Sequence, residues 1–190
     1  MKATRGLTLI ELLICLGLLG FLCLSYSTAG FEQSRQRKDI EAAMQDLQQA
    51  IGMGRAAAIS ENKTVTFCRS DDGAHCQGNW SEGSILFVDN NGNHLIDASD
   101  RLLFRFQPMK PAGTLSFNSF RNRQYLELTP RGATDSQNGN FTFCPANGDL
   151  KLARQMIVNV AGRTRMARDT DGDGIVENSQ GKPISCQSSS

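Results

Sequence analysis

The chain has 190 residues, of which 39% are hydrophobic and 21% charged, and its formal net charge is +1. This length accommodates one globular domain with an appendage and excludes two large domains. The charge is uneven: residues 101–168 carry eleven Lys and Arg against three acids, a net +8, while the remainder carries nine against sixteen, a net −7. A strongly basic segment favours a polyanionic partner.

The N-terminal segment is predicted to be a membrane-spanning helix. Residues 7–30 are nearly all apolar, which is long enough for a helix to cross the hydrocarbon core. A cleavable secretory signal peptide is the alternative, with its cleavage site among the small and polar residues 25–30. Glu11 argues against that alternative, because a carboxylate within a membrane segment costs a few kcal/mol unless it is paired. Cleavage between Gly6 and Leu7 would create an α-ammonium that pairs with Glu11 of a neighbouring subunit.

The sequence RGLTLIELL, residues 5–13, resembles the class III signal of type IV pilins and type II secretion pseudopilins. The resemblance implies a leader peptide, residues 1–6, that prepilin peptidase removes after Gly6. It also implies an N-methylated Leu7, where the family usually has Phe, and a role for Glu11 in filament assembly. The subunit would sit in the inner membrane as a single-pass protein with a periplasmic head, then join other pilins in an extracellular pilus. An ordinary single-pass anchor is the alternative.

The pattern beyond the membrane segment changes to an amphipathic one. Over residues 31–61, apolar residues recur mostly at intervals of three, four or seven between charged ones, which predicts that the helix continues. The residues of this apolar stripe are Phe31, Ile40, Met44, Leu47, Ile51 and Ala58.

Residues 62–190 are predicted to form a β-rich head with a C-terminal tail. Short apolar and β-branched runs alternate with Gly, Asn and Asp, which indicates antiparallel hairpins. The expected strands are Thr64–Cys68, Ser84–Val88, Leu102–Phe106, Leu126–Leu128, Asn140–Cys144, Met156–Val160 and Arg163–Met166. The predicted fold is therefore α+β and type IV pilin-like, a long N-terminal helix packed against an antiparallel, sandwich-like sheet.

Four cysteines of the head lie in polar, turn-rich sequence, which favours disulfides in an oxidising compartment. Three pairings are possible, and the simplest joins Cys68 to Cys76 and Cys144 to Cys186, because each bond would hold a segment that has little apolar material. A zinc site is the alternative, although the chain has no CxxC and only two histidines.

Two further stretches resemble the GspH/FimT family of pilin-like proteins. One is residues 66–93, where Cys68 to Cys76 reads C-x-x-x-D-G-x-x-C beside the family's C-S-x-D-G-x-x-C, followed by a W-x-x-G and an F-x-D-x-N hairpin; the other is Gly162-Arg163-Thr164-Arg165, which resembles the GRxR motif of FimT. The resemblance to FimT implies a minor pilin that captures extracellular double-stranded DNA for uptake in natural transformation. The motif's arginines, Arg163 and Arg165, would reach phosphates.

The residues support that function independently. Side chains alternate along a strand, so Arg163 and Arg165 share a face, and Arg154 and Arg168 would extend them into a basic ridge. Lys and Arg that contact phosphates release counterions, which gives salt-sensitive binding without base readout. The alternative is a structural minor pilin or type II secretion pseudopilin that primes filament assembly and binds no DNA.

No cofactor and no metal are expected, although two loops have oxygen ligands at calcium-like spacing. Asp169, Asp171, Asp173 and Glu177 occupy positions one, three, five and nine, but the twelfth position is Gln180. Residues 89–100 are similar but lack Gly at position six. A calcium-dependent adhesin is thus a third interpretation. The chain has no GxSxG, HExxH or P-loop, so it is not expected to be an enzyme.

Overall fold

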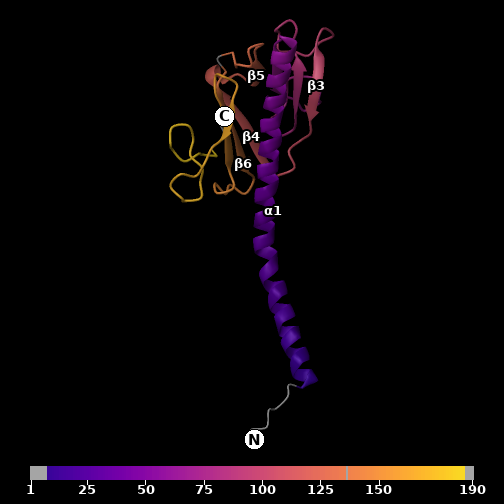
Figure 1. Ribbon diagram of the computed structural model, residues 1–190, viewed down its shortest axis with the longest axis vertical. Helices are drawn as coiled ribbons and strands as arrows, with labels where there is room; N and C mark the ends of the chain where they lie inside the picture. The colour runs from indigo at the N-terminus through magenta and orange to yellow at the C-terminus, as the bar shows by residue number, and fades with distance from the viewer. Residues whose placement is uncertain (1–7, 136, 187–190) are drawn as a thin grey trace. The chain divides into compact units, whose positions relative to one another are not determined.

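The computed structural model describes residues 8–135 and 137–186 (Figure 1). The chain forms two compact units, residues 1–38 and residues 39–190. Helix α1 contributes to both units, and the remaining elements belong to the second. The elements are α1 (Leu9–Glu61), β1 (Val65–Arg69), β2 (Ser84–Val88), β3 (Arg101–Phe106), β4 (Gly113–Ser119), the 3-10 helix η1 (Phe120–Asn122), β5 (Tyr125–Leu128), β6 (Gly139–Pro145), β7 (Arg154–Val158) and β8 (Thr164–Met166).

In the first unit, helix α1 begins just after Thr8. The Thr8 hydroxyl oxygen accepts a hydrogen bond from the main-chain N–H of Glu11 at 3.4 Å, and Thr and Glu stand at the spacing of a capping box. Large apolar side chains of this unit are exposed, so the unit presents a surface that is stable only when something covers it. They are Leu9, Ile10, Leu12, Leu13, Ile14, Leu16, Leu18, Leu19, Phe21, Leu22 and Phe31.

The expected cleavage site, Gly6 and Leu7, lies outside the described residues. Over residues 8–135 and 137–186, no helix combines the length and the apolar character that crossing a membrane requires.

The second unit contains two four-stranded antiparallel sheets. Sheet A has the strand order β3-β2-β1-β5, and sheet B has the order β4-β6-β7-β8. Both pack against α1 (Figure 1). This confirms the predicted α+β fold, a helix against an antiparallel sandwich-like head.

Strand β4 was not predicted. It pairs with β6 along its whole length, from Gly113 opposite Pro145 to Ser119 opposite Gly139. Only Leu115 and Phe117 in it are large and apolar, and both point into the core. Two such residues among small polar ones are too few for sequence reading to identify a strand.

One apolar core lies between α1 and the two sheets. The predicted stripe on α1 supplies Ile40, Met44, Leu47, Ile51 and Ala58, all buried, which confirms the amphipathic helix from Ile40 onward. The stripe was wrong at Phe31, which belongs to the first unit and is 70% exposed. The sheets contribute every second residue of their inner strands to this core, and these side chains pack against the apolar stripe of α1.

Two disulfides close the outer surfaces of the head. Cys68 bonds to Cys76 and Cys144 bonds to Cys186, as predicted. The second bond holds the C-terminal segment, which lies on the side of sheet B away from α1 (Figure 1). A small apolar cluster of Ala153, Ala167, Val176 and Ile184 fixes that segment further. The disulfides leave these cysteines no thiolate for the zinc alternative.

Candidate functional site

The Gly162–Arg165 motif lies at a tight turn between β7 and β8. Gly162 N–H donates to the Asn159 carbonyl at 2.9 Å, and Arg163 N–H donates to Asn159 Oδ1 at 3.0 Å. Gly162 has φ +69°, and a Cβ at this position would lie 2.2 Å from the carbonyl oxygen of Gly132. The turn therefore requires glycine, so the first residue of the motif has a structural role.

Arg163 and Arg165 point to the side of β8 that faces away from α1. Thr164, between them, faces the helix, because its hydroxyl oxygen accepts a hydrogen bond from Gln48 Nε2 of α1 at 3.2 Å. Neighbouring side chains in a strand point to opposite faces. Both arginines are exposed, and β8 is the edge strand of sheet B. A long polyanion can therefore approach them without displacing other strands.

The side chains of Arg163, Arg165 and the exposed Arg168 are free of bonding partners. Within the part of the chain that the structure describes, none of the three donates a side-chain hydrogen bond or forms an ion pair. Their guanidinium groups keep all their donors available for an anion.

Arg154 does not lie on this ridge, so that part of the prediction was wrong. Its side chain is only 13% exposed, and Nη2 lies 3.4 Å from Glu41 Oε1 on α1. Nη1 donates to the carbonyls of Lys151 and Ala153, each at 2.9 Å. Arg154 lies two residues before the core residue Met156 in β7, so both side chains point to the face that packs on the helix. Arg165 points to the opposite face. It joins β7 to α1.

Sequence reading missed Arg131. This exposed residue lies in the turn that ends at Gly132, whose carbonyl is in contact with Gly162. Thr134 N–H donates to the Val160 carbonyl at 2.9 Å, which fixes the two turns side by side. No sequence signal links turns about thirty residues apart. We call Arg131, Arg163, Arg165 and Arg168 the β8 arginine surface.

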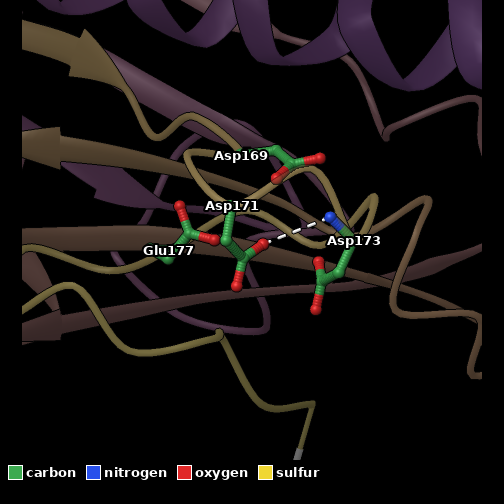
Figure 2. A group of neighbouring side chains, drawn as sticks. All are labelled: Asp169, Asp171, Asp173 and Glu177. Atoms are coloured by element: carbon green, nitrogen blue, oxygen red, sulfur yellow. Dashed lines mark hydrogen bonds between the residues drawn. The ribbon is translucent and has the colours of Figure 1, made fainter.

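An acidic loop follows Arg168. Asp169, Asp171, Asp173 and Glu177 each present a carboxylate oxygen, and these oxygens lie within 4.8 Å of one another (Figure 2). The three aspartates are exposed, whereas Glu177 is 7% exposed. The hydrogen bond from Gly172 N–H, 2.7 Å to Asp169 Oδ1, lowers the pKa of Asp169 below its ordinary value. This carboxyl is therefore ionised at neutral pH.

The carboxylates of the other calcium-like loop, residues 89–100, accept hydrogen bonds from the loop and from β1. Asp89 is buried and accepts hydrogen bonds from Thr66 Oγ1 and from the main-chain N–H groups of Gly92 and His94, at 2.7–3.0 Å. Two hydrogen bonds from Ser99 lower the pKa of Asp97 to about 2. The Ser99 hydroxyl makes the larger contribution and its main-chain N–H the smaller one. Among the described residues, this loop contains no grouping of carboxylates like that of the acidic loop.

Comparison with known families and structures places most of the head in one group. The family model described as type II transport protein GspH matches residues 43–162. That range includes most of the core and Arg131, and it ends before Arg163, Arg165, Arg168 and the acidic loop. No curated protein matches the sequence significantly.

Solved structures of two pilin-like proteins share the fold. The minor pilin FimU of Pseudomonas aeruginosa is 22% identical, with a TM-score of 0.56, over 80% of this chain and 97% of FimU. The minor pseudopilin EpsH of the Vibrio cholerae type 2 secretion system is 10% identical, with a TM-score of 0.50, over 67% of this chain and 95% of EpsH.

Proposed function

The chain belongs to the GspH family and has the type IV pilin-like fold, and from this premise we propose that it is a minor pilin whose head binds double-stranded DNA for uptake in natural transformation. The observation that carries the proposal is the β8 arginine surface. Of its four exposed arginines, Arg165 lies on the edge strand β8, Arg163 and Arg168 flank that strand, and Arg131 lies in the neighbouring turn.

The chemistry of that surface suits DNA phosphates rather than bases. Arginine donates in a planar fork that matches phosphate oxygens. A few such contacts give weak, sequence-independent affinity, with Kd on the order of 10⁻⁴ to 10⁻⁶ M at physiological salt. Because import must act on DNA of any sequence, this kind of contact is what it requires.

The N-terminal unit supports a filament subunit. Its exposed apolar side chains need neighbouring pilin helices or lipid to cover them. Cleavage after Gly6 by prepilin peptidase, N-methylation of Leu7 and pairing of Glu11 with a neighbour's N-terminus complete the proposal. Mass spectrometry of the mature protein should find N-methyl-leucine at its N-terminus.

The test of DNA binding is a gel shift with random duplex DNA and the purified full-length protein at several salt concentrations. The double substitution Arg163→Gln with Arg165→Gln should weaken binding at least tenfold. The slope of log K against log salt should fall in magnitude by about 1.8, since each lost phosphate contact removes about 0.9. Both residues are exposed, so stability should change by less than about 0.5 kcal/mol.

Lys63→Gln with Lys110→Gln is the matched control. Both lysines are exposed and lie outside the β8 arginine surface, and the pair removes the same charge. The control should keep wild-type affinity to within about twofold. Equal loss in both double variants would show that net charge, not this surface, governs binding. No shift at low salt, where such binding is tightest, at tens of micromolar protein would end the DNA proposal.

A structural role in priming a filament is the second candidate function. The observation favouring it is that the family match, residues 43–162, excludes Arg163 and Arg165. What the GspH family has in common therefore does not require these arginines. A subunit with this role alone would support pilus assembly and show no retardation of DNA.

A further inference from the structure

The acidic loop, residues 169–177, holds four carboxylates close together, and its main-chain N–H groups stabilise only part of their negative charge. Asp169 accepts hydrogen bonds from the N–H groups of Gly172 and Gly174 at 2.7 and 2.8 Å, and Asp173 accepts one from Ile175 at 2.7 Å. Four carboxylates remain together, and no Lys, Arg or His among the described residues forms an ion pair with them. Like charges this close repel unless a cation lies between them.

Glu177 supplies a second and independent observation. Its Oε2 accepts hydrogen bonds from Thr170 N–H at 2.7 Å and from Thr170 Oγ1 at 2.8 Å. Its Oε1 is buried and has no hydrogen-bond partner, in a residue that is only 7% exposed. A buried carboxylate oxygen without a partner is costly. The Glu177 carboxylate lies beside the three aspartates (Figure 2), where it can serve as a metal ligand.

We propose that Asp169, Asp171, Asp173 and Glu177 bind a calcium ion. Oxygens on opposite sides of a calcium ion with bonds of about 2.4 Å lie about 4.8 Å apart. The four ligand oxygens lie within 4.8 Å of one another, so small side-chain movements bring all of them to calcium bond lengths around one ion.

The donor set selects calcium over other cations. All four side-chain ligands are carboxylates, which suit a hard cation and exclude a preference for zinc or copper. Magnesium requires a smaller octahedron, with bonds of about 2.0–2.1 Å, and keeps most of its waters. Calcium accepts six to eight oxygens, and the Ile175 carbonyl, at the seventh position of the loop, and water would complete its shell.

The backbone of the loop has the turn that such a site needs. Gly174 stands at the sixth position with φ +92°, in the region that favours glycine. Gln180 stands where a bidentate Glu would strengthen binding, so the affinity should fall in the range of extracellular calcium modules, about 10⁻⁴ to 10⁻³ M.

The test is calorimetric titration of the EDTA-treated full-length protein with CaCl2. The titration runs to about 10 mM, which is about ten times the largest Kd in that range. The wild type should bind one calcium ion, and magnesium should bind at least tenfold more weakly. Asp171→Asn should weaken calcium binding at least tenfold, because it removes one ligand charge and leaves the fold intact at an exposed position.

Asp135→Asn is the matched control, an exposed aspartate outside the loop that loses the same charge. It should bind calcium as the wild type does. Calcium should also raise the thermal midpoint of the wild type and of Asp135→Asn but not of Asp171→Asn. No binding by about 10 mM, equal affinity for magnesium, or unchanged binding by Asp171→Asn would each overturn the proposal. None of these outcomes depends on DNA binding.

Discussion

Two loops of the head, residues 89–100 and residues 169–177, both carry three aspartates, yet they stabilise their carboxylates by different means. In the first, Asp89 is buried and each of its oxygens accepts a hydrogen bond from Thr66, Gly92 or His94. In the second, Glu177 is buried with Oε1 unpartnered, beside three exposed aspartates.

The difference shows that acidic composition alone does not make a metal site. A loop whose carboxylates are fully hydrogen-bonded to the protein gains little from a cation, whereas a loop with one buried, unpartnered oxygen gains much. Substitution should therefore cost more in the first loop, and calcium should change the stability of variants in the second loop only.

The largest expected effect is at Asp89. Asp89→Ala removes three hydrogen bonds from a buried carboxylate and leaves their donors unpaired, so the free energy of unfolding should fall by roughly 3–5 kcal/mol. The loss should be the same in EDTA and in calcium. Asp169→Ala should cost only about 1 kcal/mol in EDTA, because its two N–H donors lie at an exposed site and can bind water.

Urea unfolding of both variants in EDTA and in calcium measures these differences. In calcium the deficit of Asp169→Ala should grow, because only the wild type gains binding energy there. A calcium-dependent deficit in Asp89→Ala would contradict the comparison, since it would place an ion in the loop whose carboxylates the protein already hydrogen-bonds.

The sequence identified both loops by spacing and favoured residues 169–177, because residues 89–100 lack Gly at position six, but it could not show which carboxylates the protein itself hydrogen-bonds. What separates them is the supply of donors from elsewhere: Thr66 reaches Asp89 from β1, twenty-three residues away. Glu177 is buried because its strand-like neighbours Val176 and Ile184 pack in the cluster that the Cys144–Cys186 bond holds. Neither effect is visible in local spacing.

The same limit explains the arginines. The alternation of Arg163 and Arg165 could be read from the sequence because it is local. Arg154 could not be assigned, because its face depends on how β7 lies against Glu41 of α1. Arg131 required the contact between Gly132 and Gly162. The long helix, the disulfides and the fold class were predictable, since apolar periodicity, cysteine placement and motifs are properties of the chain itself.

A smaller effect is expected at Glu177. Glu177→Gln replaces a buried, partly unpaired charge by a neutral amide of the same shape. In EDTA the variant should therefore be more stable than the wild type by about 1–2 kcal/mol. At a calcium concentration of ten times Kd the wild type should gain about 1.4 kcal/mol and the variant nothing.

Thermal or urea unfolding of wild type and Glu177→Gln, with and without calcium, measures both differences. The difference in stability should shrink or reverse when calcium is added. If Glu177→Gln is the less stable protein in EDTA, the carboxylate is stabilised without an ion and the contrast between the loops fails.

The smallest expected effect links the acidic loop to the β8 arginine surface. Arg168 precedes Asp169 directly, so the negative carboxylates of the loop repel a phosphate that binds to this arginine. The four carboxylates carry −4, and a bound calcium ion reduces this to −2. Calcium should therefore raise affinity for duplex DNA about two- to fivefold at low salt, which corresponds to less than about 1 kcal/mol.

Gel shifts in calcium and in magnesium at equal concentration separate this effect from competition of divalent ions for DNA. The gain should disappear in Asp171→Asn and should shrink at high salt, where the Debye length falls below the spacing of the groups. An equal gain in Asp171→Asn would assign the effect to the DNA instead of the loop. Calcium binding without any DNA shift would leave the metal site intact and remove the proposed partner, because the two sites share no residue and only their fields interact.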